Sequence, residues 1–130
     1  MAQCIIVKKA LAVWCVAALL VSGSALVPAA TPTDALAVTR LSGLPEQAMQ
    51  TYALIHRGGP FASSKDGVVF GNRERLLPSR TRGYYREYTV PTPGLRHRGK
   101  KRMVCGGPPR VPDVCYYTAD HYASFRRIEP

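Results

Sequence analysis

Residues 83–94 read GYYREYTVPTPG, and this stretch decides how the rest of the chain is interpreted. Aromatic and β-branched side chains dominate residues 84–90, with one carboxylate, Glu87, in the middle. A glycine precedes the run, and two prolines and a second glycine follow it. This composition is typical of a β-strand bounded by turns. We therefore expect a strand at residues 84–90 that holds Glu87 rigidly.

Four other short runs have the composition of strands and are separated by turn-forming residues. They are VVF at residues 68–70, KRMVC at 101–105, CYYT at 115–118 and YASFRRI at 122–128. Two connections between strands are rich in arginine, LLPSRTRG and PTPGLRHRGKKR. Loops are exposed as a rule, so much of the positive charge is expected at one end of the sheet.

One helix is expected before the strands, at residues 45–56. Ala48, Tyr52 and Ile55 recur at helical spacing and would share one apolar face. A proline and a glutamate begin the segment, and GGP at residues 58–60 stops it. One helix followed by about five short strands predicts an α+β domain, in which the N-terminal helix packs on a twisted antiparallel sheet.

The N-terminal part of the chain has the features of a secretory signal peptide. Two lysines precede an apolar stretch at residues 10–21, which is too short for a comfortable membrane span. Small residues offer cleavage after Ala25, Ala29 or Ala37, and Ala29 is favoured. A membrane anchor is the alternative.

These features divide the chain into three parts. We expect a signal peptide at residues 1–29, a flexible spacer at 30–40 and one domain at 41–130. The protein would be secreted and extracellular, without stable membrane association once the signal is removed.

The chain is strongly basic, with 18 Lys and Arg against 8 Asp and Glu and a formal net charge of +10. A small domain with this excess favours polyanions, of which RNA, DNA and anionic membranes are the usual candidates.

The cysteines are explained by export. Cys4 and Cys15 lie in the expected leader, which leaves Cys105 and Cys115 in the domain. An isolated pair in an exported protein predicts a disulfide, worth roughly 2 to 3 kcal/mol in the chain-entropy model. A zinc site would need two more ligands, and no His or Cys stands at suitable spacing beside the pair. No metal or other cofactor is therefore expected.

RNA supplies its own nucleophile, the 2′-hydroxyl, so a protein that cleaves it needs a base, an acid and cations for the phosphate. Glu87 is a candidate base, and His121 in ADHYASF is a candidate acid. Arg98 and Arg102 in RHRGKKR have the planar fork that matches two phosphate oxygens. Taken singly, each residue is also compatible with a solvated glutamate, a structural histidine or an ordinary basic loop.

Six blocks, read in order, resemble the microbial guanyl-specific ribonucleases, small secreted enzymes of bacteria and fungi. They are GPF at 59–61, DGVVFGNRE at 66–74, LLP at 76–78, GYYREYTVPTPG at 83–94, RHRGKKR at 96–102 and YYTADHYASF at 116–125. The resemblance covers most of the expected domain. It implies a metal-independent endoribonuclease that cleaves single-stranded RNA after guanosine.

The resemblance also implies a role for each residue of the site. The catalytic residues would be Glu87 as general base, His121 as general acid, and Arg98 and Arg102 as phosphate ligands. The guanine-binding residues would be Phe70, Asn72, Arg73, Glu74 and Tyr122. In that scheme Glu74 accepts the two donors of guanine, backbone N–H groups near Asn72 and Arg73 donate to the base, and Phe70 stacks on it.

Two departures from the family pattern stand out. Gly71 occupies a position where streptomycete relatives carry a polar side chain, often glutamine. Those relatives also link the two ends of the domain by a disulfide, so the bridge between Cys105 and Cys115 is inferred from this chain alone.

Two rival interpretations remain open. One is a non-catalytic cationic protein that keeps the fold and coats RNA or anionic surfaces. The other is a ribonuclease toxin restrained by an acidic inhibitor of the barstar kind. For the ribonuclease we expect single-stranded RNA as the main partner and a monomeric protein.

Overall fold

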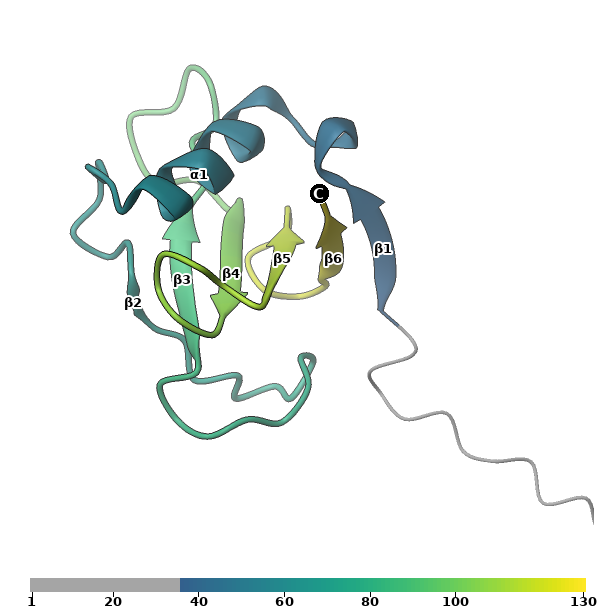
Figure 1. Cartoon of the computed structure of the whole chain (residues 1–130). Helices are drawn as coiled ribbons and strands as arrows, with labels where there is room; N and C mark the ends of the chain where they lie inside the picture. Colours follow the sequence, from purple (N-terminus) through teal and green to yellow (C-terminus); the bar gives the residue numbers. More distant parts are fainter. Residues whose placement is uncertain (1–35) are drawn as a thin grey trace, which may run out of the picture.

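The computed structural model describes residues 36–130, in which one helix packs on one face of a six-stranded sheet (Figure 1). The elements in chain order are β1 (Ala37–Arg40), the 3-10 helix η2 (Leu41–Gly43), α1 (Glu46–Arg57), β2 (Val68–Val69), β3 (Tyr85–Thr89), β4 (Arg102–Gly106), β5 (Val114–Thr118) and β6 (Arg126–Glu129). The strand order across the sheet is β1-β6-β5-β4-β3-β2. The predicted α+β class is confirmed.

The sheet is mixed, whereas an antiparallel sheet of about five strands was predicted. Strands β2 to β6 pair antiparallel, and β1 adds a sixth strand parallel to β6. All four residues of β1 fall in the flexible spacer expected at residues 30–40, so that expectation is wrong for 37–40. The β1 side chains are mostly exposed, so the strand is held by backbone pairing and leaves no hydrophobic pattern in the sequence. The expected signal peptide lies outside the described residues.

Helix α1 begins and ends one residue later than predicted. Pro45 is its N-cap, and Gly58 closes it in the left-handed conformation, with φ of 87°. The buried face consists of Ala48, Thr51 and Ile55. Thr51 is tolerated there because its hydroxyl donates to Gln47 O at 2.8 Å and lies 3.3 Å from Thr89 O. Within residues 36–130 no helix is long and apolar enough to cross a membrane.

The two faces of the sheet carry different cores. The face under α1 holds Tyr88, Met103 and Tyr117 with the helix residues, and the disulfide between Cys105 and Cys115 lies in the same cluster. The opposite face holds a second cluster of Leu77, Tyr85, Val104, Tyr116 and Phe125. Strand register places Glu87 opposite Val104, in the row of this second face. Glu87 therefore points away from the helix.

Residues 122–125 were predicted as the start of a strand but form a turn, and β6 begins only at Arg126. Side chains of residues just before this segment accept hydrogen bonds from its backbone N–H groups, which are then not available for pairing in the sheet. The Thr118 hydroxyl accepts from the Tyr122 N–H at 3.1 Å, and the Asp120 carboxylate accepts from the Ser124 N–H at 2.9 Å. Such local bonds favour turns over sheet ladders.

Candidate active site

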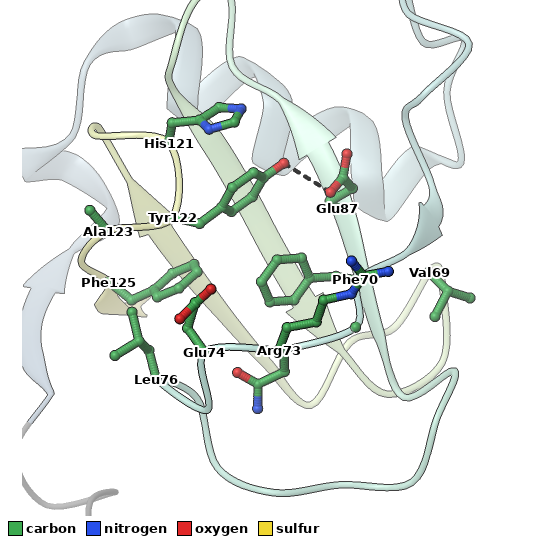
Figure 2. Close-up of a pocket in the computed structure, with 12 residues that line it drawn as sticks. Val69, Phe70, Arg73, Glu74, Leu76, Glu87, His121, Tyr122, Ala123 and Phe125 are labelled. Carbon is green, nitrogen blue, oxygen red and sulfur yellow. Dashed lines mark hydrogen bonds between the residues drawn. The ribbon is translucent and has the colours of Figure 1, made fainter.

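A cleft of about 790 Å³ opens on the sheet face opposite α1 (Figure 2). The predicted site residues that line it are Phe70, Asn72, Arg73, Glu74, Glu87, His121 and Tyr122. These residues come from β3, from the loop that follows β2 and from the turn between β5 and β6. The structure therefore brings residues that are up to 52 positions apart, from Phe70 to Tyr122, into one cleft.

Glu87 is the carboxylate at the centre of the site. Its side chain is 16% exposed, and its two oxygens have different partners. The Tyr122 hydroxyl donates to Oε2 at 2.8 Å, which Figure 2 marks with a dashed line. Arg98 Nη2 forms an ion pair with Oε1 at 3.4 Å. The carboxylate is thus held between a neutral donor and a cation.

Arg98 lies beside Glu87 in the loop between β3 and β4, and Arg102 is the first residue of β4, where it pairs with Thr89. The Arg98 Nε donates to Thr89 Oγ1 at 2.9 Å, which fixes the guanidinium beside Glu87. Arg102 is only 3% exposed, and its Nη1 donates to the carbonyls of Gly99 at 3.0 Å and Lys101 at 2.8 Å. Its Nε is buried without a hydrogen-bond partner. Neither arginine lines the cleft wall itself, but the buried Arg102 holds the loop that carries Arg98.

Tyr122 contacts both Phe70 and Glu87 within the cleft. Its ring stacks on Phe70 with centroids 5.1 Å apart and an interplanar angle of 29°. Burial, followed by the hydrogen bond to Glu87, raises the pKa of Tyr122 to about 12. The hydroxyl therefore stays protonated at neutral pH and donates to Glu87.

His121 stands exposed at one end of the cleft on a tight turn. His121 and Tyr122 have positive φ angles of 55° and 71°, which L residues seldom adopt. The His121 N–H donates to Lys100 O at 3.1 Å, so the turn is tied to the loop between β3 and β4, which carries Arg98. His121 and Tyr122 have ring centroids 4.9 Å apart.

Asp120 organises this turn and was missed by the sequence analysis. Its carboxylate accepts hydrogen bonds from the Thr118 hydroxyl at 2.8 Å and from the Ser124 N–H and hydroxyl at 2.9 and 2.5 Å. The bonds from Ser124, and then that from Thr118, lower the pKa of Asp120 to about 2. The signal available was the spacing of a threonine, an aspartate and a serine around ADHYAS, which is typical of a side-chain-capped turn.

The loop after β2 is closed by the side chain of Asn72. Its Nδ2 donates to Leu77 O at 2.8 Å, and its Oδ1 accepts from Leu77 N–H at 3.1 Å. Asn72 itself has a φ of 48°. The loop holds Glu74, an exposed carboxylate that faces the cleft (Figure 2). The sequence analysis had assigned Asn72 only a backbone contribution, and the side-chain bonds were not expected.

Three further features of the described residues bear on the site. The cleft walls also include Leu76, Ala123 and Phe125, which were not singled out as site residues. The predicted disulfide between Cys105 and Cys115 is present, on the helix side of the sheet and away from the cleft. No group of three or more His, Cys, Asp or Glu side chains suited to a metal ion occurs within residues 36–130.

Comparison with known proteins gives a consistent result. Residues 28–129 match a family model described as ribonuclease. Guanyl-specific ribonuclease Sa from Kitasatospora aureofaciens is 52% identical over 89 residues, which are 68% of this chain and 90% of that protein. Guanyl-specific ribonuclease St from Saccharopolyspora erythraea is 47% identical over 94 residues, 72% of this chain and 89% of the relative.

Two further matches extend the comparison. Guanyl-specific ribonuclease Sa3, also from Kitasatospora aureofaciens, is 57% identical over 88 residues, 68% of this chain, and the match spans 60% of the length of Sa3. A crystal structure of ribonuclease Sa2 with guanosine-2′-cyclophosphate superposes with a TM-score of 0.67 at 48% identity, and covers 74% of this chain and 98% of Sa2. The matched region of the family model contains every residue of the cleft.

Proposed function

This chain belongs to the guanyl-specific ribonuclease family, and on that premise we propose that it is an endoribonuclease that cleaves single-stranded RNA on the 3′ side of guanosine. The observation that carries the proposal is the environment of Glu87. A rigid carboxylate contacts Tyr122 and Arg98 in a cleft that also contains a histidine and a second carboxylate, Glu74.

The first step is transphosphorylation. Glu87 takes the proton of the guanosine 2′-hydroxyl, and the 2′-oxygen attacks the adjacent phosphorus. The new bond joins O2′ to phosphorus, and the bond from phosphorus to O5′ of the next nucleotide breaks. His121 gives its proton to the departing O5′. The products are a 2′,3′-cyclic phosphate and a free 5′-hydroxyl.

The second step reverses the proton roles. His121, now neutral, takes a proton from water, which attacks the cyclic phosphate, and Glu87 returns its proton to O2′. A guanosine 3′-phosphate end results. In both steps the positive charges of Arg98 and Arg102 offset the charge on the five-coordinate phosphorus.

Guanine recognition is assigned to the loop closed by Asn72. Guanine alone presents N1–H and an adjacent amino group beside the O6 acceptor, so one carboxylate can accept both donors. Glu74 faces the cleft and is suited to this role. Backbone N–H groups near Asn72 and Arg73 donate to the base edge, and Phe70 and Tyr122 supply aromatic surface for stacking.

We also propose that the protein is secreted as a monomer, with a signal peptide at residues 1–29. The apolar leader pattern and a disulfide support export. N-terminal sequencing of the protein recovered from culture medium checks the cleavage position.

An acidic inhibitor of the barstar kind would suit the charge of the chain. The formal net charge is +10, and a cleft that binds phosphate also attracts carboxylates. Co-purification with an acidic protein that abolishes cleavage would support the inhibitor. Full cleavage activity in the presence of all acidic proteins of the producing cell would contradict it.

The decisive experiment for the activity is a cleavage map. The purified protein is incubated, with EDTA present, on an RNA of known sequence, and the ends of the fragments are identified. We expect cuts only after guanosine, 2′,3′-cyclic phosphate or 3′-phosphate ends, and free 5′-hydroxyls. Binding without any cut would favour the non-catalytic cationic protein, and loss of cleavage in EDTA would contradict the mechanism.

A further inference from the structure

A second pocket of about 440 Å³ lies on the same face of the sheet as the cleft. Arg80, Arg127 and Ser79 line it, and the buried Tyr116 forms its floor. The loop after β2 runs from one pocket to the other. Leu76 lines the cleft, Pro78 lines the second pocket, and the buried Leu77 separates them.

The second pocket is positively charged. Both arginines are exposed, and within residues 36–130 the only salt bridge joins Arg98 to Glu87. Arg80 and Arg127 thus have no carboxylate partner in that part of the chain. The Arg80 guanidinium lies 4.9 Å from the Tyr84 ring centroid, which orients it. Both arginines line the pocket together with Tyr116, and their charges oppose the rise that burial causes in the pKa of Tyr116.

Strand register relates the two pockets to each other. Glu87 pairs with Val104, Val104 with Tyr116, and Tyr116 with Arg127, so all project from one row of the sheet. Three strand spacings separate Glu87 from Arg127, which is roughly 14 Å between their backbones. A short extension of an RNA strand can bridge this span.

The position of His121 indicates in which direction the bound RNA runs through the cleft. In the proposed reaction His121 protonates O5′ of the nucleotide after the guanosine, so the 3′ part of the substrate leaves at the His121 end. Figure 2 shows His121 and Leu76 at opposite ends of the cleft, with Tyr122 and Glu74 between them. The strand on the 5′ side of the guanosine therefore leads towards Leu76 and the second pocket.

We infer that Arg80 and Arg127 bind a backbone phosphate of the RNA strand on the 5′ side of the guanosine. The inference rests on the proposed function. Arginine forks suit phosphate oxygens, and an exposed pair without carboxylate partners keeps this capacity. The site would favour long RNA over dinucleotides without reading any base.

The test compares substrates of different length. Protein is purified from the medium of a secreting host that expresses the full chain, and kcat/KM is measured for GpC and for oligonucleotides lengthened stepwise at the 5′ or the 3′ end. The variant Arg80→Gln/Arg127→Gln is compared with Arg82→Gln/Arg126→Gln. The control loses the same charge from the same loop and strand, but Arg82 and Arg126 do not line the pocket. Arg126 pairs with Tyr117 on the helix side of the sheet.

We expect the double variant to have about fivefold lower kcat/KM for 5′-extended substrates. Its kcat/KM for GpC and for the 3′-extended series should be unchanged. The control should keep the full kcat/KM for 5′-extended substrates. Each single variant is also measured, and thermal melting shows that the compared proteins are folded. Equal losses in the variant and the control, or a loss on the 3′ series, would overturn the inference.

A binding measurement gives a second readout. An oligonucleotide with 2′-deoxyguanosine at the cleavage position lacks the nucleophile and cannot be cut. For the 5′-extended form, the slope of log affinity against log salt should become shallower by about 0.7 in the double variant, the value for one single-strand phosphate. An unchanged slope would contradict the inference. If the unaltered protein fails to cleave GpC at all, the proposed function fails instead.

Discussion

At the scale of single residues, Asn72 shows how one side chain sets the shape of the loop that follows β2. Its amide makes both hydrogen bonds to the backbone of Leu77, and its own backbone has a φ of 48°. Asparagine tolerates this region better than most residues, and glycine tolerates it best. Asn72 therefore contributes in two ways. Its backbone tolerates the positive φ, and its side chain closes the loop by hydrogen bonds to Leu77.

Substitutions at Asn72 separate these two contributions. Asn72→Gly tolerates the positive φ but loses the side-chain hydrogen bonds to Leu77. Asn72→Ala loses these bonds and also disfavours the positive φ. We expect Asn72→Ala to lower the free energy of unfolding by about 1 to 3 kcal/mol, and more than Asn72→Gly does, because alanine adds strain at positive φ. Urea unfolding measures both.

The same two variants should affect substrate binding more than turnover. Both should raise KM for GpC, because the loop that carries Glu74 loses its closing bonds, while kcat changes little. A collapse of kcat at unchanged KM would contradict the assignment of Asn72 to the base-binding loop.

At the scale of elements, the turn between β5 and β6 presents His121 and Tyr122 to the cleft. Asp120 holds this turn through Thr118 and Ser124, although Asp120 itself does not line the cleft. We therefore assign Asp120 the role of a positioning residue. Its lowered pKa of about 2 means that the folded protein favours the ionised carboxylate.

The pH dependence of stability follows from the direction of this shift. The ordinary pKa of 3.8 applies in the unfolded chain, and the folded value is lower, about 2. The carboxylate therefore contributes stability above pH 3.8 that is lost as the pH falls towards about 2. Asp120→Asn should reduce stability at neutral pH and flatten the decline over this window, as thermal melts at a series of pH values would show.

Asp120→Asn should also lower kcat for GpC, because His121 and Tyr122 are less firmly placed. Ser124→Ala is the milder companion, since it removes one hydrogen-bond donor and leaves the carboxylate. Identical melts for Asp120→Asn and the unaltered protein from neutral pH to about pH 2 would rule out the role given to Asp120.

The disulfide joins directly paired residues of β4 and β5 on the side of the sheet that packs on α1. The bridge closes a loop with a sequence separation of 10, for which the chain-entropy model gives roughly 2 to 3 kcal/mol. Mass spectrometry of the secreted protein should show two hydrogens fewer than the reduced mass, and reduction should lower the free energy of unfolding by that amount at most. Two free thiols in exported material would contradict the bridge.

At the scale of the whole molecule, the sequence predicted the helix and the central strands well. Glu87 and the GYYREYTV run mark β3, and the glycine and proline punctuation marks the end of α1. The sequence analysis missed β1, because a strand held by backbone pairing carries no apolar alternation. It also assigned residues 122–125 to a strand, because local side-chain bonds leave only a weak signal among aromatic residues.

For the candidate site, too, local sequence patterns predicted one part and failed to predict another. Resemblance and chemistry together named seven of the residues that line one cleft, and two arginines that lie outside its walls. They gave no account of the supporting contacts, such as Thr89 on Arg98 or the buried Arg102 under the loop, because these depend on how strands and loops meet in space. Pairwise geometry of this kind is not encoded in a local pattern.

We propose that two glutamates on one face of the sheet divide specificity from chemistry, and turnover of the four NpC dinucleotides tests this division most directly. Glu74→Ala should weaken the preference for GpC, because buried guanine donors lose an acceptor worth about 1 to 3 kcal/mol each. Glu87→Ala should lower turnover of every substrate by about 10² to 10⁴, and His121→Ala similarly, with the preference for GpC intact. A changed base preference in Glu87→Ala together with an unchanged one in Glu74→Ala would contradict the account.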